Sequence, residues 1–157
     1  MKNVTVPQIE EFSAMVLSWV GIPEGDAKIT AHILAQADLR GIDSHGVARL
    51  PIYVKRIRLG LINKEPEIKI VGENAGLAVV DGDNGLGQVV ANHAMKLCLR
   101  KARENGVSFV AVKNSNHFGI GAYYAMMALE EDMIGIVGTN TSPLMAPFGG
   151  KEPLLGT

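Results

Sequence analysis

A short polar segment near residue 45 has the residue types that carboxylate binding and proton transfer require. Within RGIDSHGVARL, residues 40–50, the hydroxyl of Ser44 and the imidazole of His45 precede the guanidinium of Arg49. An imidazole exchanges a proton near neutral pH, and a guanidinium grips a carboxylate through two parallel hydrogen bonds. If a helix begins here, residues 45 and 49 share one face. The segment is a candidate substrate site, although a structural interpretation, with Ser44 as an N-cap and Asp43 as a turn residue, stays open.

A second polar cluster, NSNHFGIG, covers residues 114–121. It follows a predicted strand and precedes a predicted helix, and such loops are where α/β proteins bind ligands. His117 is the candidate acid or base of this loop. Gly119 and Gly121 would allow a ligand to approach backbone N–H groups. The preceding polar residues are equally well explained as local caps: Asn114, Ser115 and Asn116.

The glycine-rich run DGDNGLGQ resembles a dinucleotide-binding turn only in part. It contains Gly85-x-Gly87 between a strand and a helix, but the third small residue is replaced by Val90. The acidic residue expected about 20 positions further on is also missing. The run therefore argues against a Rossmann site, and Asp81 and Asn84 are interpreted as turn residues.

Helices are predicted to dominate the first part of the chain. Apolar spacing and end signals place them at residues 6–21, 23–41 and 44–60. Asp26 is the expected N-cap of the second helix, and Pro51 requires the third to kink or to start late. His32 and His93 lie among alanines in predicted helices, where a structural role is expected.

Strands and helices alternate in the second part. Residues 67–72 and 76–82 are predicted to form a hairpin. The sequence then predicts a helix at 87–105, a buried strand at 106–114, a helix at 121–132 and a second buried strand at 133–140. This alternation predicts a layered α/β domain.

Composition excludes several classes of protein. The chain has 157 residues, of which 47% are hydrophobic and 20% charged, and its net charge is −1. Such a chain is globular, and without a basic block a nucleic-acid partner is not expected. One cysteine, Cys98, favours a reducing, cytoplasmic location. Neither a signal peptide nor a membrane span is predicted. The apolar, loop-like end leads us to expect that the chain is the first part of a longer protein.

Four motifs together resemble the type-2 malate/L-lactate dehydrogenase family. They are ADLRGIDSHGVARL, DGDNGLGQ, NSNHFGIGAYYA and GTNTSPLMAPFGG followed by LLGT. Relatives in this family include ureidoglycolate and sulfolactate dehydrogenases and cyclic imino acid reductases. The resemblance implies a layered α/β nicotinamide-binding fold that is not a Rossmann fold. It also implies a homodimer that uses NAD or NADP to interconvert a small 2-hydroxy acid and its 2-keto acid.

The resemblance also implies roles for individual residues. Ser44 and His45 match a hydroxyl–imidazole proton relay, Arg49 matches the arginine that holds the substrate carboxylate, and His117 matches an acid/base residue beside the nicotinamide. Thr157 matches a threonine near the substrate. The implied cofactor-binding residues are His117, Phe118, Gly119, Ile120, Gly121 and Ser142.

This interpretation divides the chain into a helical segment, residues 1–60, that contributes substrate residues, and the first part of a cofactor-binding domain, residues 61–157. Two alternatives stay open on the sequence alone. Asp43, His45 and His117 are a legitimate ligand set for a metal-dependent hydrolase, although no tight metal-binding spacing is present. The chain is also compatible with a non-catalytic, dimer-forming fragment. Adjacency of Ser44 and His45 does not indicate a hydrolase dyad, because neighbouring side chains are expected to diverge.

Overall fold

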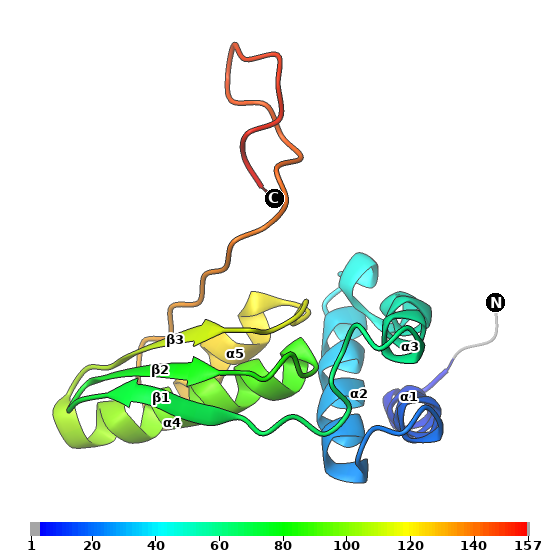
Figure 1. Ribbon diagram of the computed structural model, residues 1–157, viewed down its shortest axis with the longest axis horizontal. Coiled ribbons are helices and arrows are strands. Elements are labelled where there is room, and N and C mark those ends of the chain that lie inside the picture. Colours follow the sequence, from blue (N-terminus) through cyan, green and yellow to red (C-terminus); the bar gives the residue numbers. More distant parts are fainter. Residues whose placement is uncertain (1–3, 157) are drawn as a thin grey trace.

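Three helices lie beside a small sheet that carries two further helices. The computed structural model describes residues 4–156. Figure 1 shows the helical group next to the sheet and its helices. The helices are α1 (Val6–Trp19), α2 (Glu24–Leu39), α3 (Leu50–Arg58), α4 (Gly87–Asn105) and α5 (Gly121–Met127), and the strands are β1 (Lys69–Glu73), β2 (Leu77–Asp81) and β3 (Phe109–Lys113). No helix within residues 4–156 is long and apolar enough to cross a bilayer.

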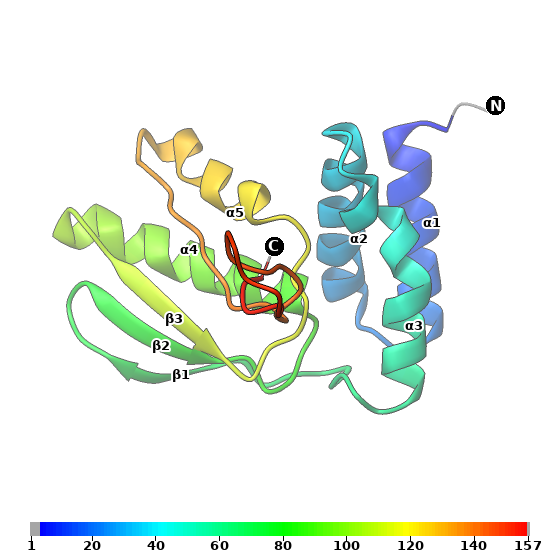
Figure 2. The same cartoon turned by 90° about the horizontal axis from the view of Figure 1, so that it is seen from above.

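Helix α2 is the central element of the molecule. It packs against α1 on one side and against α4 and α5 on the other, as Figure 2 shows. Contacts on several sides explain why it has no single apolar stripe and buries seven residues: Ala27, Thr30, Ala31, Ile33, Leu34, Ala35 and Ala37. Helix α1 buries Ser13 and Leu17, whereas Phe12, Met15 and Trp19 on this helix are exposed.

The sheet combines an antiparallel and a parallel pair. Strands β1 and β2 form the predicted hairpin, with Lys69 opposite Asp81. Strand β3 runs parallel to β2, with Leu77 opposite Phe109. A parallel pair requires a long crossover connection, and α4 supplies it. The sequence prediction of a layered α/β fold is therefore confirmed.

Helix α4 covers one face of this sheet. Ala78 and Val80 of β2 pack against Leu97 of α4. Residues of the opposite face are exposed, including Leu77, Val79 and Phe109. The prediction that β3 is a buried strand is therefore wrong, because β3 lies at the sheet edge and α4 covers only one of its faces.

Three other expectations differ from the structure. Asp26 is not an N-cap, because α2 begins two residues earlier and places Asp26 in its first turn. The helix expected at 121–132 ends at Met127 and continues as a short 3-10 turn, Leu129–Glu131. Residues 133–140 form no strand, and Ile134 is 91% exposed, because nothing in the described part of the chain pairs with this segment. Residues 133–137 instead run back beside α5 (Figure 2), where a Cβ on Gly135 would lie 2.2 Å from the Ala125 carbonyl oxygen. The later residues up to 156 lead away from the sheet and helices (Figure 1).

Candidate active site

The polar segment of the first cluster forms two tight turns and not one helix. Asp43–His45 and Val47–Arg49 are separate 3-10 turns, and α3 begins only at Leu50, with Pro51 in its first turn. No helix begins at residue 45, so the condition under which residues 45 and 49 would share one helical face is not met. Arg49 instead turns back, and its Nε donates to the backbone carbonyl of Ser44 at 2.7 Å.

Asp38, at the end of α2, anchors these turns. Its Oδ2 accepts a hydrogen bond from the backbone N–H of Val47 at 2.9 Å. Gly46 is buried against the same carboxylate, and a Cβ at this position would lie 1.7 Å from Asp38 Oδ1. Any other residue there would have to displace the Asp38 carboxylate, which explains the Gly46 of the motif. Asp38 is not among the residues predicted for the site, although it lies within the motif ADLRGIDSHGVARL.

Ser44 and His45 interact directly although they are neighbours in sequence. Ser44 Oγ lies 2.9 Å from His45 Nδ1 within the first 3-10 turn. The expectation that these side chains diverge is wrong, because the tight turn brings them to one side. The His45 ring in turn lies 5.3 Å from the His117 ring, centroid to centroid. The two polar clusters of the sequence therefore meet in space.

The loop that carries His117 is held by α4 and by the turn before it. Asn116 Nδ2 donates to the carbonyls of Asn84 and Gly85, at 3.0 and 2.9 Å. A Cβ at Gly87 would lie 2.2 Å from the Asn116 carbonyl oxygen and 2.4 Å from that of His117. The second glycine of Gly85-x-Gly87 therefore makes room for the His117 loop. The expectation that Asn116 caps its own loop is wrong, because its side-chain partners lie in the turn before α4 and on α3.

Two buried side chains support the His117 ring from behind. Tyr53 of α3 places its hydroxyl 2.9 Å from His117 Nδ1. Gln88 of α4 donates from Nε2 to the same hydroxyl at 2.7 Å. Tyr53 is 2% exposed and Gln88 is fully buried. Neither residue is among those predicted for the site, and the one sequence signal for Tyr53 is its position one helical turn after Arg49.

The electrostatic environment favours a neutral His117. Partial burial lowers the pKa of His117 below its ordinary value, and the positive charges of Arg49 and His45 lower it further. Burial raises the pKa of Tyr53 to about 12, so its hydroxyl keeps its proton. The charge of Arg49 thus acts on both groups, and a bound anion that neutralises this charge would favour protonation of His117.

The remaining predicted site residues lie in different surroundings. Phe118 stacks on Tyr124, and its carbonyl accepts a hydrogen bond from the Tyr124 hydroxyl. Gly119 and Ile120 are the buried part of the His117 loop, and Gly121 begins α5. Ser142 is exposed in the segment that leads away from the sheet, and within residues 4–156 it makes no hydrogen bond with the site. Thr157 lies outside the described residues.

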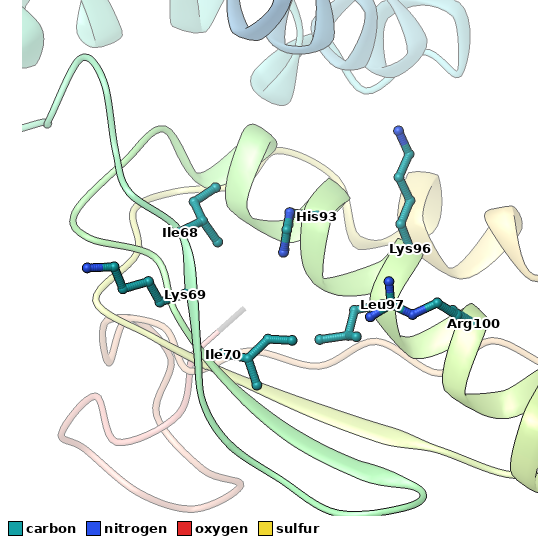
Figure 3. A pocket seen from close by; sticks show the side chains of 7 residues that line it. All are labelled: Ile68, Lys69, Ile70, His93, Lys96, Leu97 and Arg100. Atoms are coloured by element: carbon teal, nitrogen blue, oxygen red, sulfur yellow. The ribbon is translucent and has the colours of Figure 1, made fainter.

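The metal site of the alternative hypothesis finds no support in the geometry. Within residues 4–156, no group of three His, Cys, Asp or Glu side chains lies close enough to hold a metal ion. An open groove of about 530 Å³ lies between β1 and α4 (Figure 3), where His93, Lys96 and Arg100 line it. This groove shares no residue with the His117 cluster, so it does not contribute to the site.

Comparison with known proteins decides the family. The sequence matches the profile of the malate/L-lactate dehydrogenase family over residues 4–157. The chain belongs to this family. The family resemblance seen in the motifs is therefore confirmed, and the fold is that of malate/L-lactate dehydrogenases and not a classical Rossmann fold.

Individual malate/L-lactate dehydrogenases are similar over nearly the whole chain. L-sulfolactate dehydrogenase from Methanocaldococcus jannaschii is 56% identical over 142 residues, which cover 90% of this chain and 41% of that relative. Malate dehydrogenase from Pyrococcus abyssi is 56% identical over 156 residues, covering 98% and 43%. The structure of malate dehydrogenase from Pyrococcus horikoshii OT3 superposes with a TM-score of 0.92 at 46% identity, covering 99% of this chain and 44% of that one. The chain spans less than half the length of these relatives.

Proposed function

We propose that the protein transfers a hydride between a nicotinamide cofactor and a small 2-hydroxy or 2-keto acid. The observation that carries this proposal is the convergence of Arg49, the Ser44–His45 pair and His117, which belong to two distant segments of the chain. The cluster offers a fixed cation and a group that exchanges protons. A 2-hydroxy acid needs both, one for its carboxylate and one for its hydroxyl.

Arg49 is proposed to hold the substrate carboxylate. Its Nε is already used by the Ser44 carbonyl, which fixes the plane of the guanidinium. The two terminal nitrogens are then the ones we expect to donate to a carboxylate. Holding the substrate at this end orients C2 and its oxygen toward the histidines.

His117 is proposed to exchange the proton on the substrate oxygen. When a 2-keto acid is reduced, the hydride reaches C2 and the carbonyl oxygen takes a proton from the imidazolium. When a 2-hydroxy acid is oxidised, the neutral ring takes the hydroxyl proton. The lowered pKa of His117 suits the second direction, and the Ser44–His45 pair is placed to pass the proton onward.

The cluster has no group that can itself accept a hydride, which fits the use of a redox cofactor. A bound nicotinamide would supply or accept the hydride. The His117 loop is the place where we propose it binds, with Phe118, Gly119, Ile120 and Gly121 forming the loop and Ser142 and Thr157 completing the sites from the later segment. The choice between NAD and NADP is part of the test below.

Malate and sulfolactate are the substrates we propose to try before others. The two relatives with 56% identity are called L-sulfolactate dehydrogenase and malate dehydrogenase. Both acids carry a second anionic group beyond the 2-hydroxy acid unit.

A substrate panel tests the proposal. The whole protein is incubated with NADH or NADPH and one of oxaloacetate, sulfopyruvate, pyruvate or glyoxylate, and the absorbance of the reduced nicotinamide is followed. We expect turnover with at least one of these acids, and turnover with none of them would contradict the proposal. The Arg49→Lys variant is assayed beside the wild type. It keeps the positive charge and removes the planar guanidinium, so we expect slower turnover of the same acid.

We further propose a cytoplasmic homodimer in which residues 1–60 contribute substrate residues and residues 61–157 the cofactor loop. Exposed apolar side chains on α1 support an interface between copies, because Trp19 is 73% exposed and Met15 61%. Sedimentation velocity of the whole protein measures its oligomeric state directly. A monomer at micromolar concentration would contradict the homodimer.

A further inference from the structure

The hydrogen bonds behind His117 form a chain with a defined direction. Gln88 Nε2 can only donate, so the Tyr53 oxygen accepts from it. The Tyr53 hydroxyl keeps its own hydrogen for another acceptor, and His117 Nδ1 lies 2.9 Å away. The backbone N–H of Gly119 also points to this nitrogen, at 3.4 Å. In this arrangement Nδ1 acts as an acceptor, which corresponds to a neutral ring with its proton on Nε2.

The chemistry proposed for His117 requires the opposite arrangement at Nδ1. An imidazolium carries hydrogens on both nitrogens, so Nδ1 must donate. After the ring gives its Nε2 proton to the substrate oxygen, the neutral ring keeps its remaining proton on Nδ1. In both states Tyr53 must accept from His117, and its own hydrogen then needs another acceptor.

Gln88 holds the acceptor that this second arrangement needs. Gln88 is fully buried, and its Oε1 has no hydrogen-bond partner among residues 4–156. A buried amide oxygen without a partner is costly and calls for an explanation. Rotation of the amide by half a turn exchanges Nε2 and Oε1, and Oε1 then accepts from the Tyr53 hydroxyl.

We propose that Tyr53 and Gln88 are positioning residues that form a reversible hydrogen-bond relay to Nδ1 of His117, and that rotation of the Gln88 amide reverses this relay when the ring takes up a proton. The relay keeps Nδ1 satisfied in every protonation state and leaves Nε2 for the substrate. Neither residue touches the substrate in this account. The inference rests on the proposed role of His117 as the proton-exchanging residue.

Gln88 can be changed without removing the charged and titratable groups around the His117 ring, so the effect of the relay can be measured separately from theirs. Among the described residues, the titratable and charged groups that face His117 are His45 and Arg49 from the two 3-10 turns and Tyr53 from α3. Substitutions at Gln88 leave all three in place. The buried hydroxyl of Tyr124 offers a matched control, because it donates to the Phe118 carbonyl and not to His117.

The test measures the pKa of His117 by two-bond ¹H–¹⁵N NMR of its ring in the substrate-free protein. Gln88→Met fills similar space but has no oxygen, so the protonated ring leaves the Tyr53 hydrogen unpaired. We expect the pKa of His117 to fall by roughly half a unit to one unit. Gln88→Glu offers only acceptors when ionised, and we expect the pKa to rise and Nδ1 to be protonated in the neutral ring. Tyr124→Phe should change neither quantity.

A double variant separates the relay from a simple charge effect. In the Tyr53→Phe background, Gln88→Glu should no longer place the proton on Nδ1, because the hydroxyl that connects the two residues is gone. An effect that persists without Tyr53 would overturn the relay. An unchanged pKa in Gln88→Met, or equal shifts of one sign in Gln88→Met and Gln88→Glu, would show that Gln88 only fills space. If Gln88→Met fails to fold, the comparison of Gln88→Glu with and without Tyr53→Phe still tests the relay.

This experiment is independent of the proposed activity. The NMR titration needs neither substrate nor cofactor, so the relay can be confirmed even if the substrate panel shows no turnover. Conversely, turnover with an unchanged titration in Gln88→Met would retain the function and remove the relay.

Discussion

Replacing Gly87 with alanine should damage both stability and activity, because this position holds the His117 loop against α4. A Cβ there would lie 2.2 Å from the Asn116 carbonyl oxygen and 2.4 Å from the His117 carbonyl oxygen. Carbon and oxygen atoms that are not bonded do not approach so closely, and both oxygens belong to the backbone and cannot rotate away. The loop must therefore move by about 1 Å, a displacement comparable to those that cost roughly 10²-fold in rate when they misplace a catalytic group.

The expected magnitude follows from this overlap. Overpacking of a buried site typically costs about 1–3 kcal/mol, so the free energy of unfolding of Gly87→Ala should fall by about that amount. In urea, the transition midpoint should move to lower concentration with an unchanged slope. With a substrate found in the panel, kcat/KM should fall by about 10²-fold.

Gly25→Ala is the matched control for this experiment. Gly25 lies in the first turn of α2, and a Cβ there meets no atom within 4 Å. Alanine favours a helix over glycine, so this variant should be as stable as the wild type or slightly more stable. If Gly87→Ala keeps wild-type stability and turnover, the account of Gly87 as a packing glycine is refuted.

Other changes test separate parts of the site. Arg49→Lys should lower kcat/KM by roughly 10- to 100-fold through the loss of a charged hydrogen bond, while the Kd of the cofactor stays the same; equal losses of both would count against a carboxylate role. Gly46→Ala should displace the Asp38 carboxylate and lower the free energy of unfolding by about 1–3 kcal/mol, measured by urea unfolding, and an unchanged midpoint would speak against this contact. The lowered pKa of His117 means that the unfolded chain binds the proton more readily, so its contribution to stability is complete above about pH 6.5 and is lost as the pH falls through the lowered pKa. The stability of the wild type relative to His117→Ala should accordingly decrease toward acidic pH, and a difference that is constant with pH would contradict the shift.

The fold was predictable wherever local signals were strong. Periodicity, turn residues and proline geometry account for the hairpin of β1 and β2, for the helix from residue 87 to 105 and for the late start of α3 at Leu50, with Pro51 in its first turn. The segment 133–140 was not predictable in the same way, because an apolar run forms a strand only where another strand pairs with it. Likewise, the exposure of Phe109 depends on which face α4 covers, and the sequence of β3 alone does not contain that information.

The site was predictable by residue type but not by geometry. Ser44, His45, Arg49 and His117 were all identified from their chemistry and from the family resemblance. Their meeting depends on contacts between distant segments, such as the Asn116 side chain on the carbonyls of Asn84 and Gly85, which no local pattern encodes. Tyr53 and Gln88 were missed for the same reason. A buried tyrosine and a buried glutamine resemble ordinary helix residues until the hydrogen bond between them is seen.

Isotope transfer from the substrate tests the central claim most directly. The whole protein is incubated with L-malate or sulfolactate that carries deuterium at C2, together with NAD or NADP, and the reduced cofactor is analysed by mass spectrometry and NMR. The account predicts that deuterium moves from C2 to the nicotinamide ring, and that His117→Ala slows this transfer in a correctly folded protein. Reduced cofactor without deuterium, or no reduced cofactor with either acid, would contradict hydride transfer from the C2 position of a 2-hydroxy acid.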